Sequence, residues 1–206
     1  MKSRGQRVAG IILAAGASTR MGKPKQLLPV HGQTLLGLII DEALKSDLDK
    51  VFLVLGHHAE EIRAALGKTP NHPKLKVIEN SLYKKGISTS IRAGLSKAEE
   101  DHDNVMILLA DMPHIDARLI NLLLQRFLKS CLPLGAVSIK GKRSHPVIFG
   151  RKLYRELHQL KGDVGARELF LRYGEQVCLV EPEGFYDDRD IDTLKDYISH
   201  SVSQIP

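Results

Sequence analysis

Three cations and two glycines near the start of the chain have the residue types and spacing of an anion-binding loop. Arg20, Lys23 and Lys25 follow the apolar segment Val8–Ala15, and Gly16 and Gly22 lie in the same stretch. Glycines let the backbone approach a ligand closely, so consecutive N–H groups can line a concavity that accepts an anion. The pattern therefore predicts a loop that binds polyphosphate. A strand-to-helix turn with solvated cations would have the same composition.

The spacing in this loop excludes two better-known phosphate loops. Five residues separate Gly16 from Gly22, whereas a Walker loop has four between its glycines, and Pro24 follows Lys23 where that loop has Ser or Thr. The dinucleotide fingerprint G-x-G-x-x-G is also absent here. The loop is therefore expected to belong to another class of nucleotide-binding site.

A carboxylate is expected near the same loop. Asp111 ends the apolar run Val105–Ala110, and Pro113 prevents the strand from continuing smoothly. If this strand neighbours the first, Asp111 faces the phosphate loop and can hold Mg²⁺ against phosphate oxygens. A helix cap is the alternative, but Asp116 is better placed to cap the helix that follows.

A second acidic group lies late in the chain, at 187–192. Mg²⁺ is commonly held by one or two carboxylates together with phosphates, so Asp190 or Asp192 could supply the second ligand. A solvated acidic face is the alternative, with Asp192 or Thr193 capping the last helix.

Serine hydroxyls open a helix after the predicted strand Lys76–Glu79. Ser88 and Ser90 follow Gly86, and their hydroxyls and the free N–H groups of the first turn could read a nucleobase edge. Alternatively, Ser88 simply caps the helix.

The remaining candidates lie between residues 140 and 175. His145 follows Lys142 and Arg143, a setting suited to binding an anion. Asp163 is expected to cap a helix that begins near Gly165. Arg167 could reach a phosphate or stay solvated.

Apolar strands alternating with helical patterns predict one α/β domain over residues 1–206 with a mostly parallel sheet. Residues 141–146 are expected to form a tight basic turn in a hairpin-like insertion over the sheet edge, within a second lobe at 140–175 for an acceptor. The expected strands are Val8–Ala15, Val51–Leu55, Lys76–Glu79, Val105–Ala110, Gly135–Ile139 and Gln176–Val180. The expected helices are Thr34–Lys45, Ala59–Leu66, Thr89–Glu99, Asp116–Leu128, Lys152–Leu160, Ala166–Arg172 and Thr193–His200.

Composition narrows the classes of partner. The formal charge is +6, but the cations are interleaved with acidic residues and there is no Trp, which favours an anionic small molecule over nucleic acid. No apolar run is long enough for a membrane span, and no typical signal cleavage site follows the basic start, so we expect a cytoplasmic protein. Cys131 and Cys178 support neither a disulfide framework nor a zinc site and are expected to be buried.

Together these motifs resemble those of nucleotidyltransferases with a glycosyltransferase-A-like, Rossmann-related fold, and among them the molybdenum cofactor guanylyl- and cytidylyltransferases. The resemblance covers nearly the whole chain. It implies a three-layer α/β/α fold of the nucleotide-diphospho-sugar transferase type. The motifs are the first loop, Leu13-Ala14-Ala15-Gly16 to Gly22 with Lys25, then Ala110-Asp111-Met112-Pro113, and finally Asp190-Ile191-Asp192-Thr193.

The choice of nucleotide depends on one position. Members that use GTP typically have Leu-Ala-Gly-Gly in the first motif, and those that use CTP have Leu-Ala-Ala-Gly. This chain has the second form, from Leu13 to Gly16. The segments 143–146 and 162–167 also resemble the cytidylyl branch, although that branch commonly has Gly where Ser144 stands.

The resemblance implies transfer of CMP from CTP to the phosphate of molybdenum-bound molybdopterin, with release of pyrophosphate, for a molybdenum hydroxylase such as xanthine dehydrogenase. Mg²⁺ is the expected cofactor, with Mn²⁺ as an alternative. Transfer to another phosphate acceptor, or non-catalytic cofactor delivery, remains open. The implied catalytic residues are Arg20, Lys25 and Asp111; the nucleotide-binding residues Leu13, Ala14, Ala15, Gly16, Gly22, Lys25, Gly86, Ser88 and Ser90; the acceptor-binding residues His145, Asp163 and Arg167; and the metal ligands Asp111, Asp190 and Asp192.

Overall fold

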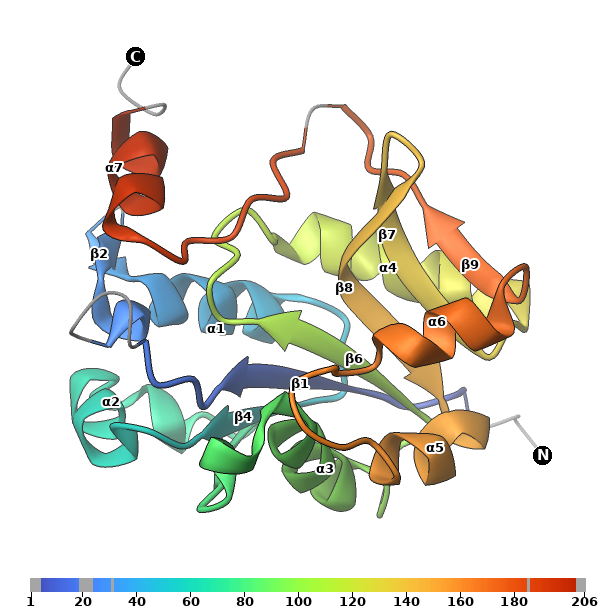
Figure 1. Cartoon of the computed structure of the whole chain (residues 1–206), viewed down its shortest axis with the longest axis horizontal. Helices are drawn as coiled ribbons and strands as arrows, with labels where there is room; N and C mark the ends of the chain where they lie inside the picture. Colours follow the sequence, from blue (N-terminus) through green and yellow to red (C-terminus); the bar gives the residue numbers. More distant parts are fainter. Residues whose placement is uncertain (1–4, 19–23, 31, 185, 203–206) are drawn as a thin grey trace.

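A seven-stranded, mostly parallel sheet with helices on both faces forms the centre of the molecule (Figure 1). The computed structural model describes residues 5–18, 24–30, 32–184 and 186–202. The strand order is β5-β4-β1-β6-β8-β7-β9. In this sheet β8 runs antiparallel to both of its neighbours, and the other described pairs are parallel. The predicted α/β class and mostly parallel sheet are therefore confirmed.

The predicted strands are present, and no boundary is shifted by more than one residue. Two short strands, β2 and β3, form a separate antiparallel pair that the sequence patterns did not predict. The strands are β1 Val8–Ala14, β2 Pro29–Val30, β3 Gln33–Thr34, β4 Lys50–Leu55, β5 Leu75–Glu79, β6 Asn104–Leu109, β7 Leu134–Ile139, β8 Lys142–Gly150 and β9 Val177–Val180.

Each predicted helix is also present, and four short 3₁₀ turns accompany them in the described chain. The α-helices are α1 Leu35–Lys45, α2 Ala59–Ala65, α3 Ile87–Ala98, α4 Ala117–Ser130, α5 Tyr154–His158, α6 Arg167–Tyr173 and α7 Leu194–Val202. The 3₁₀ turns are η1 Lys25–Leu27, η2 Thr69–Asn71, η3 Tyr83–Lys85 and η4 Arg151–Leu153.

The two faces of the sheet bury separate cores because side chains alternate along each strand. In β1, Val8, Ile12 and Ala14 pack with residues of α1, α2 and α4. The alternate residues, including Ile11, pack with residues of α3, α5 and α6. A Cβ on Gly94 of α3 would lie 2.5 Å from Ile11 Cγ2, so the missing side chain lets α3 pack close to β1.

Two helices start at side-chain caps that the sequence predicts. The Asp116 carboxylate accepts a hydrogen bond from the Leu119 N–H at 2.8 Å and caps α4. Thr193 and Asp196 bond reciprocally to each other's N–H groups at the start of α7. This pair has the form of a capping box and confirms Thr193 as a helix-starting residue.

The predicted insertion at 141–146 is wrong. The turn is only Lys140–Gly141, where both residues have positive φ, and β8 lies inside the sheet between β6 and β7. The pairing register with β7 shifts between Ala136 and Val137, next to Pro146. Such an irregularity admits a proline, which cannot donate a ladder hydrogen bond, so the proline does not mark the end of the strand.

The predicted burial of both cysteines is wrong for Cys131. This residue is exposed, and Cys178 is partly buried. Cys131 follows the last turn of α4 with φ of 56°, so it lies where the chain leaves the helix at the surface. Among the described residues, no helix is both long and apolar enough to cross a membrane.

Candidate active site

The first loop and Asp111 lie at the same edge of the sheet. β6 pairs with β1 in parallel, with Leu13 opposite Leu109, so the carboxyl ends of the two strands meet. This is the arrangement predicted for Asp111. Open α/β sheets bind ligands at the carboxyl ends of their strands, and the loops here can therefore form a ligand site.

A buried glutamine holds the first loop. Gln26 is 3% exposed, and its Nε2 donates to the carbonyl oxygens of Ala14 at 3.2 Å and Gly16 at 3.1 Å. Its Oε1 accepts from the Ser18 hydroxyl, and that hydroxyl accepts from the Lys25 N–H. These bonds fix the backbone of Lys25 relative to the end of β1. The side chains of Leu13, Ala14 and Ala15 are buried, so this motif presents backbone rather than side chains.

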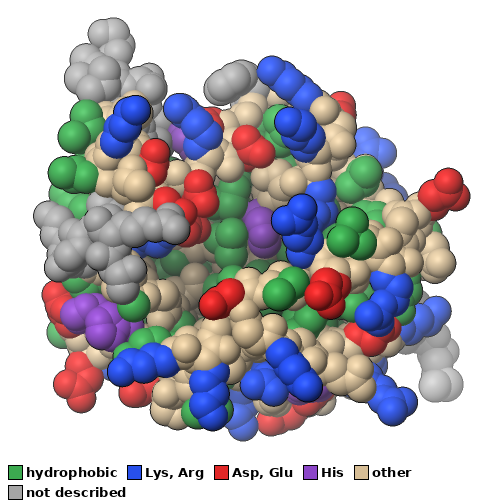
Figure 2. Space-filling view, viewed as in Figure 1, with side chains coloured by type: hydrophobic (Ala, Val, Ile, Leu, Met, Phe, Trp, Pro, Cys, Tyr) green, Lys and Arg blue, Asp and Glu red, His purple; other side chains and the backbone are tan. Residues whose placement is uncertain are grey.

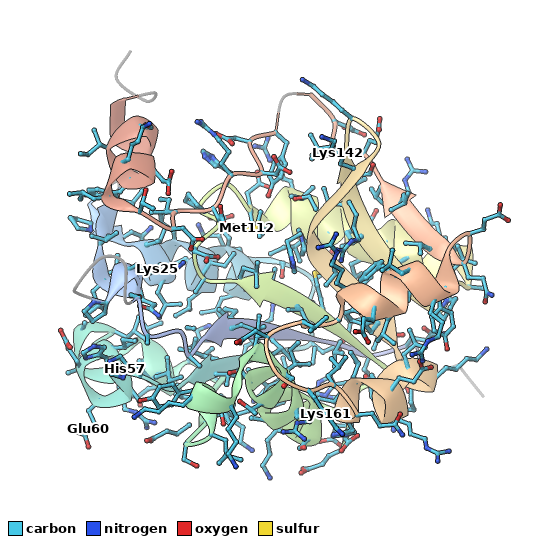
Figure 3. The ribbon with its side chains drawn as sticks, in the orientation of Figure 1. Lys25, His57, Glu60, Met112, Lys142 and Lys161 are labelled. Atoms are coloured by element: carbon cyan, nitrogen blue, oxygen red, sulfur yellow. The ribbon has the colours of Figure 1, made fainter. Side chains whose placement is uncertain are left out.

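Lys25, which is labelled in Figure 3, contacts two of the predicted metal ligands. Its Nζ is 2.7 Å from Asp111 Oδ2 and 2.7 Å from Asp192 Oδ1. Burial alone would lower the pKa of Lys25, but the two carboxylates outweigh it and raise the pKa above its ordinary value. The ammonium group therefore stays charged near neutral pH.

Three carboxylates form one cluster. Asp111, Asp190 and Asp192 each offer an oxygen, and these oxygens lie within 4.8 Å of one another. Partial burial, followed by the charges of Asp192 and Asp111, raises the pKa of Asp190. Asp111 Oδ1 is buried and has no hydrogen-bond partner among the described residues. Hard divalent cations prefer carboxylate oxygens, so the donor set and this unpartnered oxygen fit Mg²⁺ or Mn²⁺.

The segment that carries Asp190 and Asp192 is anchored to the loop after β6. The Ile191 N–H donates to the Asp111 carbonyl at 2.9 Å, and Ile191 is buried in a small cluster with Leu28 and Leu35. Because alternate residues of an extended chain face opposite ways, burying Ile191 turns both neighbouring aspartates toward Lys25. Figure 1 shows this late segment passing over the carboxyl edge before α7.

The start of α3 differs from its prediction. Gly86 is the residue before the helix and Ser88 lies inside its first turn, so the alternative in which Ser88 caps the helix is wrong. The Ser88 N–H donates to the Gly162 carbonyl at 3.1 Å, and the Ile87 N–H donates to Asp163 Oδ1 at 3.1 Å. These N–H groups, expected to be free for a nucleobase, are therefore satisfied by a loop 76 residues away.

The serine hydroxyls point into the protein. Ser90 Oγ accepts from Asn80 Nδ2 at 3.0 Å in a buried position, so the prediction that it faces a nucleobase is wrong. Ser88 is 1% exposed, and its hydroxyl has no partner among the described residues. Asp163 caps α3 instead of the helix after Gly165, which corrects a second prediction. The burial of the serine hydroxyls and the cap by Asp163 both depend on contacts between residues far apart in the sequence, and local sequence patterns do not reveal such contacts.

A basic group consists of Arg143 on β8 and Arg167 at the start of α6, which lie near each other. The Arg143 guanidinium lies 4.3 Å from the ring centroid of Phe170, and partial burial together with the Arg167 charge lowers its pKa. Neither arginine pairs with a carboxylate in the part of the chain that the structure describes. Burial, and then Arg143, lower the pKa of His145 to about 4, while Asp111 partly offsets them. His145 is therefore neutral near pH 7 and offers a hydrogen bond rather than a charge.

Figure 2 shows a hollow on this face of the molecule. Acidic side chains border it on one side, and a histidine with basic side chains borders it on the other. Arg20, Gly22 and Lys23 lie outside the described residues, so their predicted contacts with phosphate remain predictions. The geometry offers one end for a divalent cation and another for an anion.

A family model for the MobA-like NTP transferase domain matches residues 10–177. The chain belongs to this family. The nucleotidyltransferase is 33% identical to the purine catabolism protein PucB of Bacillus subtilis, covering 91% of this chain and 93% of that protein. It is 27% identical to nicotine blue oxidoreductase of Paenarthrobacter nicotinovorans, covering 91% and 93%. It is 28% identical to molybdenum cofactor cytidylyltransferase of Escherichia coli, covering 92% and 93%.

A solved structure also resembles the nucleotidyltransferase along nearly its whole length. The crystal structure of Rv0371c from Mycobacterium tuberculosis has a TM-score of 0.84 and 26% identity, covering 96% of this chain and 99% of that one. The predicted family and fold type are therefore confirmed.

His57 and Tyr83 lie beside the first loop and were not predicted from the sequence motifs. His57 Nδ1 lies 3.0 Å from the Tyr83 hydroxyl, and the His57 N–H donates to the Ala15 carbonyl. A Cβ on Gly56 would lie 2.7 Å from Tyr83 Cβ, so this glycine lets the loops after β4 and β5 meet. The sequence signal was available, because Gly56-His57 follows directly after an apolar strand.

Proposed function

We propose that this nucleotidyltransferase moves CMP from CTP to the phosphate of molybdenum-bound molybdopterin and releases pyrophosphate, with Mg²⁺ as its cofactor. The observation that carries the proposal is the cluster of Lys25 with Asp111, Asp190 and Asp192 at the carboxyl edge of β1 and β6. Its donor groups match the needs of phosphoryl transfer, which depends on positioning and on stabilising charge.

The nucleotide is assigned to the first loop and its neighbours. Lys25 would bind the triphosphate, with Arg20 from the part of the loop outside the described residues. The backbone at Gly16 and the rings of His57 and Tyr83 would enclose the nucleobase. The motif Leu13–Gly16 favours CTP, as does the similarity to the Escherichia coli cytidylyltransferase.

The metal is assigned to the three carboxylates. Asp111 would be the central ligand, because one of its oxygens is already buried without a partner among the described residues. When bound, the cation would neutralise charge on the phosphate oxygens during transfer. The related Rv0371c has also been crystallised in complex with manganese, and that structure is 27% identical to this chain with a TM-score of 0.79. This supports Mn²⁺ as a substitute for Mg²⁺.

The acceptor is assigned to the basic group across the hollow. Arg167 and Arg143 are fixed positive charges that would bind the acceptor's phosphate, and neutral His145 would contribute a hydrogen bond. Asp163 would act indirectly, because it caps α3 and holds the neighbouring loop. A phosphate monoester oxygen attacks the α-phosphorus, the bond to the leaving pyrophosphate breaks, and no general base is needed.

Group transfer fits this site better than redox chemistry, although one relative is named an oxidoreductase. The first loop lacks the glycine fingerprint of dinucleotide-binding enzymes. The recipient of the product would be a molybdenum hydroxylase such as xanthine dehydrogenase, which agrees with the name of the Bacillus subtilis relative as a purine catabolism protein.

The test is Mg²⁺-dependent pyrophosphate release from CTP, with and without molybdenum-bound molybdopterin. We expect release that requires the acceptor and is lost in Asp111→Asn, whereas the exposed and distant Asp101→Asn serves as a matched control and keeps it. Release in Asp111→Asn would remove the metal assignment. Tight binding of the cofactor with no release would favour a delivery protein, and release with a sugar or polyol phosphate alone would favour another acceptor.

A further inference from the structure

Lys25 already pairs with two of the three carboxylates that could hold a divalent cation. Its Nζ lies 2.7 Å from both Asp111 Oδ2 and Asp192 Oδ1, and an oxygen of Asp190 lies within 4.8 Å of theirs. The Lys25 side chain is 15% exposed, and that of Asp111 is 19% exposed, so the contact is largely shielded from water. An ion pair in such a setting is stronger than one at an open surface.

The ammonium and a metal ion cannot share these oxygens. A bound Mg²⁺ lies about 2.1 Å from each carboxylate oxygen, so a cation on the same two oxygens would be almost in contact with the ammonium. Two positive charges at that separation repel strongly in a partly buried site. A divalent cation that takes Asp111 Oδ2 and Asp192 Oδ1 must therefore displace the ammonium group from them.

The Lys25 side chain can move while its backbone stays fixed. The Lys25 N–H is bonded to Ser18 Oγ at 3.1 Å, and the neighbouring Gln26 is tied to the end of β1. Four flexible side-chain torsions remain, and these let an ammonium group change partners without a change of fold.

We infer that Lys25 is the resident counter-ion of the Asp111–Asp190–Asp192 cluster in the nucleotide-free protein, and that a divalent cation binds by displacing its ammonium group. The displaced group becomes available to an anion in the same hollow, which under the proposed function is the triphosphate. The metal alone then binds weakly, because it competes with an internal cation.

The first test measures Mn²⁺ binding to the nucleotide-free full chain from the loss of the free-ion electron paramagnetic resonance signal. Lys25→Met should bind Mn²⁺ at least about tenfold more tightly than the wild type, because a competing unit charge in direct contact is gone. Lys195→Met removes the same charge from an exposed residue of the nearby α7 and should stay within about threefold of the wild type, as expected of a screened charge.

Unchanged or weaker binding in Lys25→Met, relative to Lys195→Met, would overturn the inference. Asp111→Asn separates this result from the proposed metal site. If Asp111→Asn binds Mn²⁺ as well as the wild type does, the assignment of the metal site is wrong. If the two lysine variants bind Mn²⁺ equally and Asp111→Asn does not bind it, the metal site stands and only the counter-ion role of Lys25 is wrong.

A second test needs no variant. Lys25 in the wild-type protein should react faster with an amine-acylating reagent when Mg²⁺ is added without nucleotide, because the released amine leaves the two carboxylates. Peptide mass spectrometry measures this rate at Lys25, with Lys195 as the internal reference. Equal rates at Lys25 with and without saturating Mg²⁺ would contradict displacement.

Discussion

Gly86→Ala is expected to destabilise the protein through the contact between α3 and the loop at residues 160–166. Gly86 has φ of 102° and ψ of 168°, a region that is essentially restricted to glycine, where another residue costs about 1–3 kcal/mol. The new Cβ would also lie 2.4 Å from the carbonyl carbon of Gly162. The loop must therefore move away from the helix.

Moving the loop breaks two hydrogen bonds at the start of α3. These are the bonds from the Ser88 N–H to the Gly162 carbonyl and from the Ile87 N–H to Asp163. At about 1 kcal/mol each, their loss brings the expected decrease in the free energy of unfolding to about 3–5 kcal/mol.

Gly67→Ala is the matched control in a urea unfolding assay. Gly67 also has positive φ, 55°, but a Cβ there would meet nothing within 4 Å, so only the backbone cost of about 1–2 kcal/mol applies. Equal destabilisation by the two substitutions would refute the reasoning, because the close approach of Gly162 would then contribute nothing.

Two further predictions concern residues that shape the site. Gln26→Leu removes the donor to the buried carbonyls of Ala14 and Gly16. Each unpartnered group costs about 1–3 kcal/mol, so we expect pyrophosphate release to fall at least about tenfold. Unchanged turnover with an intact circular dichroism spectrum would contradict this expectation. The folded protein depresses the pKa of His145 to about 4, so below pH 6.5 the histidine binds a proton more readily in the unfolded chain than in the folded one. Lowering the pH from 6.5 toward 4 therefore decreases the free energy of unfolding. The free energy of unfolding should therefore lose about 2 kcal/mol between pH 7 and 5 through this group. Urea unfolding at both pH values should show a smaller loss in His145→Gln, and an identical loss would count against a buried neutral histidine.

The fold was predictable wherever one local pattern determines the structure. The apolar segment Val8–Ala15 predicts a buried parallel strand, and Asp116 predicts the start of α4, because both signals come from neighbouring residues. β8 was not predictable in the same way. Its proline and basic residues are typical of a turn, and the register shift that accommodates Pro146 exists only once β7 is beside it.

The site was predictable in its chemistry but not in its internal contacts. Asp111 and the late aspartates were expected near the phosphate loop, and burial of Ile191 is the long-range contact that brings Asp190 and Asp192 there. Asp163 was assigned to the wrong helix because its partner, Ile87, is 76 positions away in the sequence. The buried amide of Gln26 carries no motif of its own, and only the folded loop shows its partners.

The identity of the transferred nucleotide decides whether this enzyme makes the cytosine dinucleotide. The purified protein is given equal concentrations of CTP and GTP, with Mg²⁺ and molybdenum-bound molybdopterin, and the dinucleotide product is identified by mass spectrometry. We expect a cytosine dinucleotide from the wild type and none from Asp111→Asn. A guanine dinucleotide, or no dinucleotide from a protein that still binds the cofactor, would contradict it.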